Sequence, residues 1–285
     1  MLALAPVEPT TETSTEIVRR SGANLAFALA VLPKQKRRDM GVFYAFCRVV
    51  DDIADEVGMD VAVRRAGLNR WRGLISGQTT DPHPGIETEF VDLCQRYAFG
   101  EGDLEAIIDG VEMDLDPQEF ETADDLKAYC YRVASAVGLA SIEIFGYTDP
   151  KTKVYAEELG YALQWTNIMR DVGEDAGEGR VFLPTEDIER FGLTRSELLN
   201  GPPDPEKFRE LMAFDETVAR CYYESAIHSL PSVDREAMRS AEMMRRIYSG
   251  ILDRMKADHY QVFKTLYRLS KPRMIAEFFR AKYLG

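Results

Sequence analysis

The stretch YAFCRVVDDIADE, residues 44–56, decides the fold. Its apolar residues recur at helical spacing, yet it carries four acidic residues between positions 51 and 56. On a helix, Asp51 (or Asp52) and Asp55 lie one turn apart on one face, together with Tyr44 and Arg48. Like charges at this spacing destabilise an isolated helix by about 0.2–0.5 kcal/mol. A bound cation is therefore expected to offset them.

A second acidic stretch, QWTNIMRDVGED, occupies residues 164–175. On a helix, Gln164, Asn167 (or Ile168), Asp171 and Asp175 share one face. Carboxylates together with substrate phosphate oxygens are the ligands that Mg²⁺ prefers. Two acidic pairs on two helices therefore predict a Mg²⁺ site that binds a polyphosphate. The spacing alone leaves open the alternative of an acidic, solvated helix face.

The remaining periodicity is helical nearly everywhere from residue 15 onward, and prolines fall mostly between the periodic segments. Because proline inside a helix costs about 3 kcal/mol, these prolines indicate helix ends. The sequence predicts an all-α single domain, residues 15–285, whose helices surround a shared cavity; residues 1–14 are predicted to be a disordered tail. The predicted helices are 16–32, 34–57, 60–76, 86–99, 101–114, 122–146, 150–176, 204–229, 233–257 and 259–283.

Composition narrows the class of function. The net charge of −13 argues against nucleic-acid binding, which depends on lysine and arginine. The four cysteines show no metal-binding spacing and are expected to be reduced. No apolar run approaches the roughly 20 residues of a membrane span. We expect a cytoplasmic protein, with peripheral contact with the inner membrane left open.

The C-terminal end differs from the acidic remainder. From Asp234 onward, 12 lysines and arginines face 6 aspartates and glutamates. Phe278, Phe279 and Arg280 in the last predicted helix suit an interfacial position. Peripheral contact with anionic lipid and an ordinary solvated helix face both explain this excess.

Small residues recur between Tyr129 and Ser141, among them Ala134, Ser135 and Gly138. Such a face lets two helices approach closely, or leaves room for a long apolar ligand. Spacing alone does not distinguish these alternatives.

Three motifs in this order resemble those of squalene/phytoene synthases: residues 44–56, YCYRVA at 129–134, and NIMRDVGED followed by GRVFLP between 167 and 184. The resemblance runs from about Ser21 to Arg280. It implies an isoprenoid-synthase-like helical bundle around a central apolar cavity. Within the family, the chain is most similar to the bacterial enzymes of hopanoid-type squalene synthesis that form presqualene diphosphate.

The resemblance implies a Mg²⁺-dependent prenyltransferase that joins two farnesyl diphosphates head to head. Tyr129 matches a family tyrosine near the reacting carbons. The residues implied to hold Mg²⁺ are Asp51, Asp55, Asn167, Asp171 and Asp175. Those implied to lie near the diphosphates are Tyr44, Arg48, Gln164, Arg170 and Tyr248.

Several alternatives stay open at this point. The substrate is either C15 or, as in phytoene synthases, C20, and Asn24 is similar to the hydroxysqualene-forming branch. NADPH use is not indicated by a glycine-rich fingerprint, although relatives that use NADPH lack one too. A chain elongator or terpene cyclase, and an inactive relative that serves as an assembly factor, are the remaining rivals; the presence of all four metal aspartates argues against the last.

Overall fold

The computed structural model describes residues 10–20, 29–56, 58–116 and 118–268. Within these ranges the chain is helical and has no strand, which confirms the predicted all-α class. A single hydrophobic core extends from Ile17 to Tyr267, as expected for one domain. The α-helices are α1 Ser14–Arg20, α3 Lys34–Asp55, α4 Val61–Ile75, α5 Ile86–Arg96, α6 Asp103–Met113, α7 Ala123–Cys130, α8 Ala136–Phe145, α9 Lys151–Gly177, α10 Thr185–Arg190, α11 Arg195–Leu199, α12 Pro205–Ser229 and α13 Arg239–Ala257.

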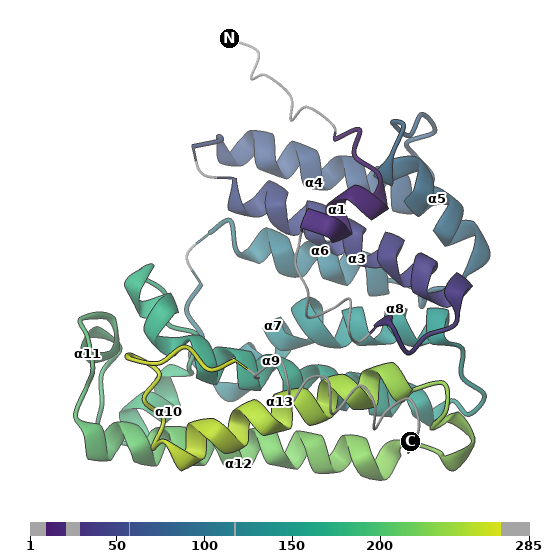
Figure 1. Ribbon diagram of the computed structural model, residues 1–285. Helices are drawn as coiled ribbons and strands as arrows, with labels where there is room; N and C mark the ends of the chain where they lie inside the picture. The colour runs from purple at the N-terminus through teal and green to yellow at the C-terminus, as the bar shows by residue number, and fades with distance from the viewer. Residues whose placement is uncertain (1–9, 21–28, 57, 117, 269–285) are drawn as a thin grey trace.

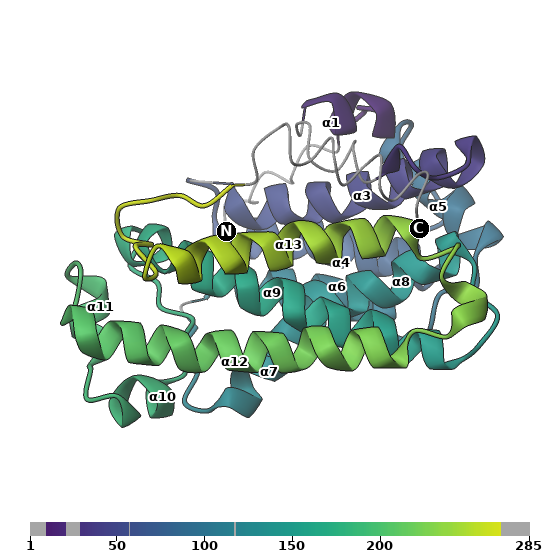
Figure 2. The same cartoon turned by 60° about the horizontal axis from the view of Figure 1, so that its bottom comes forward.

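The helices form two groups with α7 and α8 between them (Figure 1). In the first group, α3 packs against α1, α4, α5 and α6. In the second, the long helix α9 packs against α12 and α13, which run alongside it (Figure 2). Because α8 contacts α3, α6 and α9, it joins the two groups.

Helix starts follow the predicted punctuation. Pro33, Pro150 and Pro184 are the N-caps of α3, α9 and α10. Thr122 caps α7 and forms a reciprocal capping box with Asp125, as its sequence predicts. Pro33 and Pro150 thus mark where α3 and α9, the helices that carry the acidic residues, begin.

The predicted helix 122–146 is interrupted by a π-helical segment, η1, Tyr131–Ser135. Two neighbouring glycines explain how this wider turn fits. A Cβ atom on Gly160 of α9 would lie 2.5 Å from Ser135 Cα, and one on Gly110 of α6 would lie 2.9 Å from Arg132 Cβ. Single π-helical turns are frequent at functional sites, because they change the direction in which side chains point.

The predicted helix 233–257 is wrong at its start, because α13 begins only at Arg239. Residues 232–234 form a short 3₁₀ turn, η2. The Asp234 carboxylate does not cap its own helix. It accepts hydrogen bonds from the backbone N–H groups of Thr148 (2.7 Å) and Asp149 (2.9 Å), just before α9.

The predicted helix 259–283 is also wrong in its described part, since residues 259–268 form turns and extended chain. His259 and Tyr260 have φ values of 51° and 55°, which end α13 in the left-handed region. The Tyr260 hydroxyl then donates to the buried Glu216 carboxylate of α12. Residues 269–285, including the aromatic and basic residues considered for membrane contact, lie outside the described ranges.

The structure tests the predicted N-terminal tail only in part. The predicted tail, residues 1–14, lies mostly outside the described ranges and stays a prediction; Glu12 O accepts a hydrogen bond from Ile86 N (2.9 Å). Asn24 also lies outside. The short helices α10 and α11 were not predicted, because six and five residues are too few to show a helical period. No helix in the described part of the chain is long and apolar enough to cross a bilayer.

Candidate active site

A forked cavity lies between the two groups of helices. Its first branch, of about 390 Å³, lies between α3, α6 and the α7–α8 segment. Its second branch, of about 280 Å³, lies between α8, α9 and α13. Met40, Val133, Val137 and Ser141 line both branches, so the branches meet along one shared apolar wall.

Asp51 lines the first branch, whereas the neighbouring Asp52 does not. Asp52 is bound by two arginines, Arg48 at 2.5 Å and Arg20 at 3.2 Å. Asp55 is the last residue of α3 and is exposed. Of the two residues that the spacing allowed, Asp51 is therefore the one that faces the cavity.

The charge of Asp51 is poorly compensated. Burial raises the pKa of Asp51 to about 7; the positive charge of Arg48 opposes this shift, and the negative charges of Asp55 and Asp114 add to it. No arginine or lysine within the described ranges forms an ion pair with Asp51. An additional cation would stabilise its ionised form.

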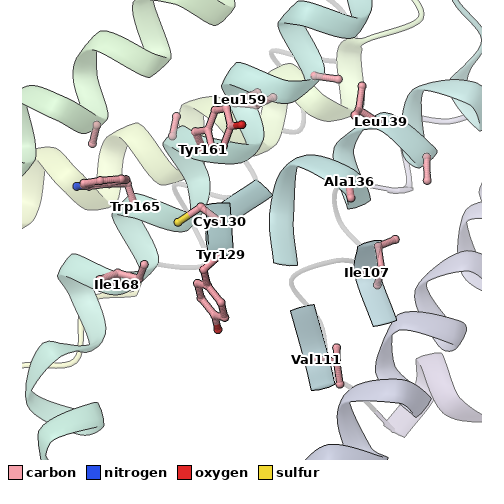
Figure 3. Close-up of a cluster of buried hydrophobic side chains, with 14 of the residues drawn as sticks. Ile107, Val111, Tyr129, Cys130, Ala136, Leu139, Leu159, Tyr161, Trp165 and Ile168 are labelled. Atoms are coloured by element: carbon pink, nitrogen blue, oxygen red, sulfur yellow. The ribbon is translucent and has the colours of Figure 1, made fainter. Parts of the chain in front are cut away.

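Asn167 and Gln164 of α9 line the second branch. Asn167 Nδ2 donates to Gln164 Oε1 (3.3 Å), while the buried Oδ1 of Asn167 accepts no hydrogen bond from the described residues. Ile168, the alternative at this position, packs in the buried cluster beside Trp165 (Figure 3). A buried oxygen without a donor is costly unless a cation or a ligand group binds it.

The two aspartates of α9 in the predicted site, Asp171 and Asp175, each lie near an arginine. Arg170 donates to both oxygens of Asp171, with Nε–Oδ1 at 2.7 Å and Nη2–Oδ2 at 2.6 Å. Although burial alone would lower it, the pKa of Arg170 is raised by its bonds to Asp171 and Tyr248. Arg180 Nη2 lies 3.8 Å from Asp175 Oδ1.

Burial raises the pKa of Asp175 to about 7; Arg180 opposes this shift and the negative charge of Asp171 adds to it. Like Asp51, Asp175 is therefore a half-buried carboxylate beside another carboxylate. A divalent cation at this end of α9 would favour the ionised form of Asp175.

The structure adds Asp114 to the site. Asp114, directly after α6, accepts a hydrogen bond from the Tyr129 hydroxyl (3.1 Å to Oδ1). Burial raises the pKa of Asp114 to about 6, with Tyr129 and Arg180 opposing the shift and Asp55 adding to it. Asp114 thus lies in the fields of groups from α3, α7 and the loop after α9. It was missed because its partners come from other helices, which no spacing within α6 reveals.

Tyr129 is buried at the edge of the first branch. Its ring points away from Cys130, whose sulfur lies on the side of α9 (Figure 3). Burial and the neighbouring Asp114 raise the pKa of Tyr129 well above its usual value, so the hydroxyl keeps its proton and acts as a donor. Tyr44 lines the same branch and Tyr248 lines the second.

The described residues do not form a complete Mg²⁺ site by themselves. Among residues 10–20, 29–56, 58–116 and 118–268, no three Asp, Glu, His or Cys side chains converge closely enough to hold an ion by themselves. Mg²⁺ usually binds one or two carboxylates, with waters and substrate phosphate oxygens completing its shell. The unpartnered Asn167 Oδ1 and the weakly compensated Asp51 fit ions that bind together with a diphosphate.

The model of the squalene/phytoene synthase family matches residues 18–274. The chain is 33% identical over 276 residues to a 15-cis-phytoene synthase of Synechocystis sp., covering 91% of this chain and 80% of that protein. It is 39% identical over 178 residues to a presqualene diphosphate synthase of Rhodopseudomonas palustris, covering 62% and 63%.

Solved structures show the same fold. A dehydrosqualene synthase in complex with a ligand superposes with a TM-score of 0.82 at 26% identity, covering 95% of this chain and 94% of that one. A squalene synthase from Alicyclobacillus acidocaldarius superposes with a TM-score of 0.77 at 24% identity, covering 87% and 93%. Because the family match spans nearly the whole chain, the protein belongs to the squalene/phytoene synthase family.

Proposed function

We propose that the protein condenses two molecules of farnesyl diphosphate head to head, giving presqualene diphosphate and inorganic diphosphate in a Mg²⁺-dependent reaction. The observation that carries this proposal is the fork of the cavity. Two apolar branches that share one wall can hold two prenyl chains with their reactive ends close together. A reaction with a single prenyl substrate needs only one branch.

The residues proposed to hold the metal lie on two helices, α3 and α9. Asp51 and Asp55 of α3, with Asn167, Asp171 and Asp175 of α9, would hold Mg²⁺. When bound, Mg²⁺ would neutralise the diphosphate and make it a better leaving group. Arg48, Arg170, Tyr44, Gln164 and Tyr248 are proposed to bind and orient the diphosphates.

The chemistry begins at the donor chain. Its C1–O bond breaks, diphosphate leaves with the electron pair, and an allylic cation remains. The C2=C3 double bond of the acceptor attacks that C1, and loss of a proton from C1 closes the cyclopropane. The apolar walls that both branches share would keep water away from the cation, which water would otherwise capture.

Tyr129 and Asp114 are proposed to act together. The Tyr129 hydroxyl is close to the shared wall, and its hydrogen bond to Asp114 fixes its direction. In this position the hydroxyl can orient a diphosphate oxygen or assist the loss of the C1 proton. Asp114 is a positioning residue in this proposal, because it acts through Tyr129.

Farnesyl diphosphate is proposed over the C20 donor because the chain is also similar to a presqualene diphosphate synthase of Rhodopseudomonas palustris, at 39% identity over 178 residues. The second candidate, condensation of geranylgeranyl diphosphate to phytoene, is favoured by the Synechocystis relative, which is named a phytoene synthase. Whether the cyclopropyl diphosphate is the final product, or is reduced with NADPH to squalene, is decided by experiment.

The test is product analysis by mass spectrometry. The purified protein is incubated with farnesyl diphosphate and Mg²⁺, with and without NADPH, and in parallel with isopentenyl diphosphate. We expect a C30 diphosphate without NADPH, and the NADPH arm shows where the reaction stops. Chain extension with isopentenyl diphosphate, or cyclic C15 products alone, would contradict the proposal.

A further inference from the structure

The second branch is a channel with a polar end and an apolar end. Asn167 and Gln164 mark its polar end on α9, and Tyr155 is the last lining residue at the opposite end. On α8 the last lining residue is Phe145, which is also the last residue of the helix. Both aromatic side chains are buried.

Phe145 and Tyr155 lie at the same end because α8 and α9 are antiparallel. A Cβ on Gly138 would lie 2.8 Å from Ala156 O, while a Cβ on Gly160 would lie 2.5 Å from Ser135 Cα. Residue numbers thus rise along α8 as they fall along α9. Phe145 and Tyr155 therefore both line the part of the channel that lies away from Asn167.

Other contacts hold this floor in place. The Tyr155 hydroxyl donates to Glu242 Oε1 (3.1 Å), and Glu242 is in turn paired with Arg245 (2.9 Å). The Phe145 carbonyl accepts a hydrogen bond from Lys36 Nζ of α3. A longer ligand would have to displace the Phe145 or the Tyr155 ring. The backbone of Phe145 is hydrogen-bonded to α3, and the hydroxyl of Tyr155 is hydrogen-bonded to α13.

The depth of the channel favours a C15 tail. Positions 155 and 167 are separated by about 18 Å along α9, at a rise of about 1.5 Å per residue. The Tyr155 ring occupies part of this length. An extended carbon chain gains about 1.3 Å per bond, since bonds of about 1.5 Å zigzag, so a farnesyl chain spans about 14 Å and a geranylgeranyl chain about 19 Å.

We propose that Phe145 and Tyr155 form the floor of the second branch and limit the prenyl tail that this branch accepts to 15 carbons. This inference rests on the proposed head-to-head function and names its specificity-determining residues. Neither residue lines the first branch. Removing the Phe145 ring would therefore lengthen only one of the two branches.

This asymmetry gives a specific expectation. A Phe145→Ala variant should accept one C20 and one C15 substrate, because the first branch keeps its original depth. The mixed product contains 35 carbons. Phe145→Leu, which leaves more of the packing intact, should shift the products in the same direction to a smaller extent.

The experiment offers equimolar farnesyl and geranylgeranyl diphosphates with Mg²⁺ to each protein, and C30, C35 and C40 products are quantified by mass spectrometry. The original protein should make C30 at least about tenfold over C35, since one excess methylene group already discriminates about 10–200-fold. In Phe145→Ala the C35/C30 ratio should rise about tenfold or more. Leu139→Ala is the matched control, because Leu139 is a buried residue of α8 that lines neither branch.

Equal use of both substrates by the original protein, or an unchanged product ratio in both Phe145 variants, would overturn the assignment of the floor. A lack of any head-to-head product would instead contradict the proposed function. The floor is then still tested by calorimetric binding of farnesyl and geranylgeranyl thiodiphosphates, since the original protein should bind the C15 compound more tightly and Phe145→Leu should reduce that preference.

Discussion

On α9, arginines partner the carboxylates of the candidate site, whereas on α3 the carboxylate that faces the cavity has no ion pair within the part of the chain that the structure describes. Arg170 forms bidentate hydrogen bonds with the Asp171 carboxylate, and Arg180 lies near Asp175. On α3, Arg48 binds Asp52, and no described arginine or lysine forms an ion pair with Asp51. The two helices therefore differ in how much of their charge the protein itself balances.

This difference indicates a division of roles. The α9 end brings its own positive charges, which can also contact a diphosphate. At the α3 end, burial and the nearby aspartates raise the pKa of Asp51. A cation bound there would stabilise the ionised form of Asp51 more than a cation at α9 would stabilise its carboxylates. We infer that Mg²⁺ matters most at α3 and that the arginines contribute most at α9.

The largest expected effect comes from comparing Asp51 with its neighbour. Asp51→Asn should lower kcat/KM for farnesyl diphosphate by about 10³-fold, which corresponds to about 4 kcal/mol of lost transition-state stabilisation. Asp52→Asn is the matched control and should lower it only a few-fold, since Asp52 binds Arg20 and Arg48. Steady-state kinetics across Mg²⁺ concentrations measures both. Equal losses in the two variants would remove the distinction between the two aspartates.

The next effect concerns Tyr129 and Asp114. Tyr129→Phe should lower kcat about 10²-fold, because general acid–base groups contribute about 10²–10⁴-fold. Asp114→Asn should lower it about tenfold, since positioning partners typically contribute about 10–100-fold. If Asp114 acts through Tyr129, the double variant should be no worse than Tyr129→Phe alone. Fully multiplicative losses would show that the two residues act independently.

A smaller effect is expected at the balanced end. Arg170→Gln should raise KM for farnesyl diphosphate about tenfold with a lesser change in kcat, because it removes a charged donor beside the diphosphate site. The same substitution frees Asp171, so the half-saturating Mg²⁺ concentration should not rise. Arg65→Gln serves as control, since Arg65 pairs with Glu112 and Asp116 and lines neither branch. A rise in the Mg²⁺ requirement of Arg170→Gln would contradict the division of roles.

Much of the fold was predictable because it depends on local signals. Prolines at positions 33 and 150 start α3 and α9, and the Thr122–Asp125 box starts α7. The faces of α3 and α9 that carry the acidic residues followed from helical spacing alone. The sequence could narrow the candidates to Asp51 or Asp52, and to Asn167 or Ile168, but only packing chose between them.

The features that were missed depend on contacts between distant segments. Asp114 joins the site through Tyr129, which lies on another helix. Asp234 falls at the start of the predicted helix 233–257, but its carboxylate binds backbone amides before α9. His259 and Tyr260, which follow α13, adopt the left-handed conformation although neither is a glycine, so the sequence does not indicate that the helix ends there. In each case the outcome is set by tertiary contacts rather than by local propensity.

The last comparison separates a site carboxylate from a structural one, and its effect is on stability rather than on activity. Asp215 is fully buried; its Oδ1 accepts from Trp165 Nε1 (3.0 Å), and its Oδ2 has no donor among the described residues. Burial raises the pKa of Asp215 to about 7, Trp165 opposes this shift and Asp187 adds to it. Because the folded state then holds a proton that the unfolded state releases above pH 4, stability should fall as pH rises from about 4 to 7, by up to about 4 kcal/mol.

Asp215→Asn should remove this part of the pH dependence and be more stable than the original protein at pH 8. Chemical denaturation at several pH values measures the difference between the two proteins. Mg²⁺ with diphosphate should stabilise both proteins equally, because Asp215 lines neither branch. An identical pH slope in the two proteins would show that Asp215 is ionised at little cost.

The claim that two prenyl chains react head to head in the forked cavity is tested most directly with farnesyl diphosphate that carries two deuterium atoms at C1. Two such molecules bring four deuterium atoms, and closure of the cyclopropane removes one from the donor C1. The account predicts a C30 diphosphate that retains three deuterium atoms. A C30 product that retains all four, or C15 products alone, would contradict it.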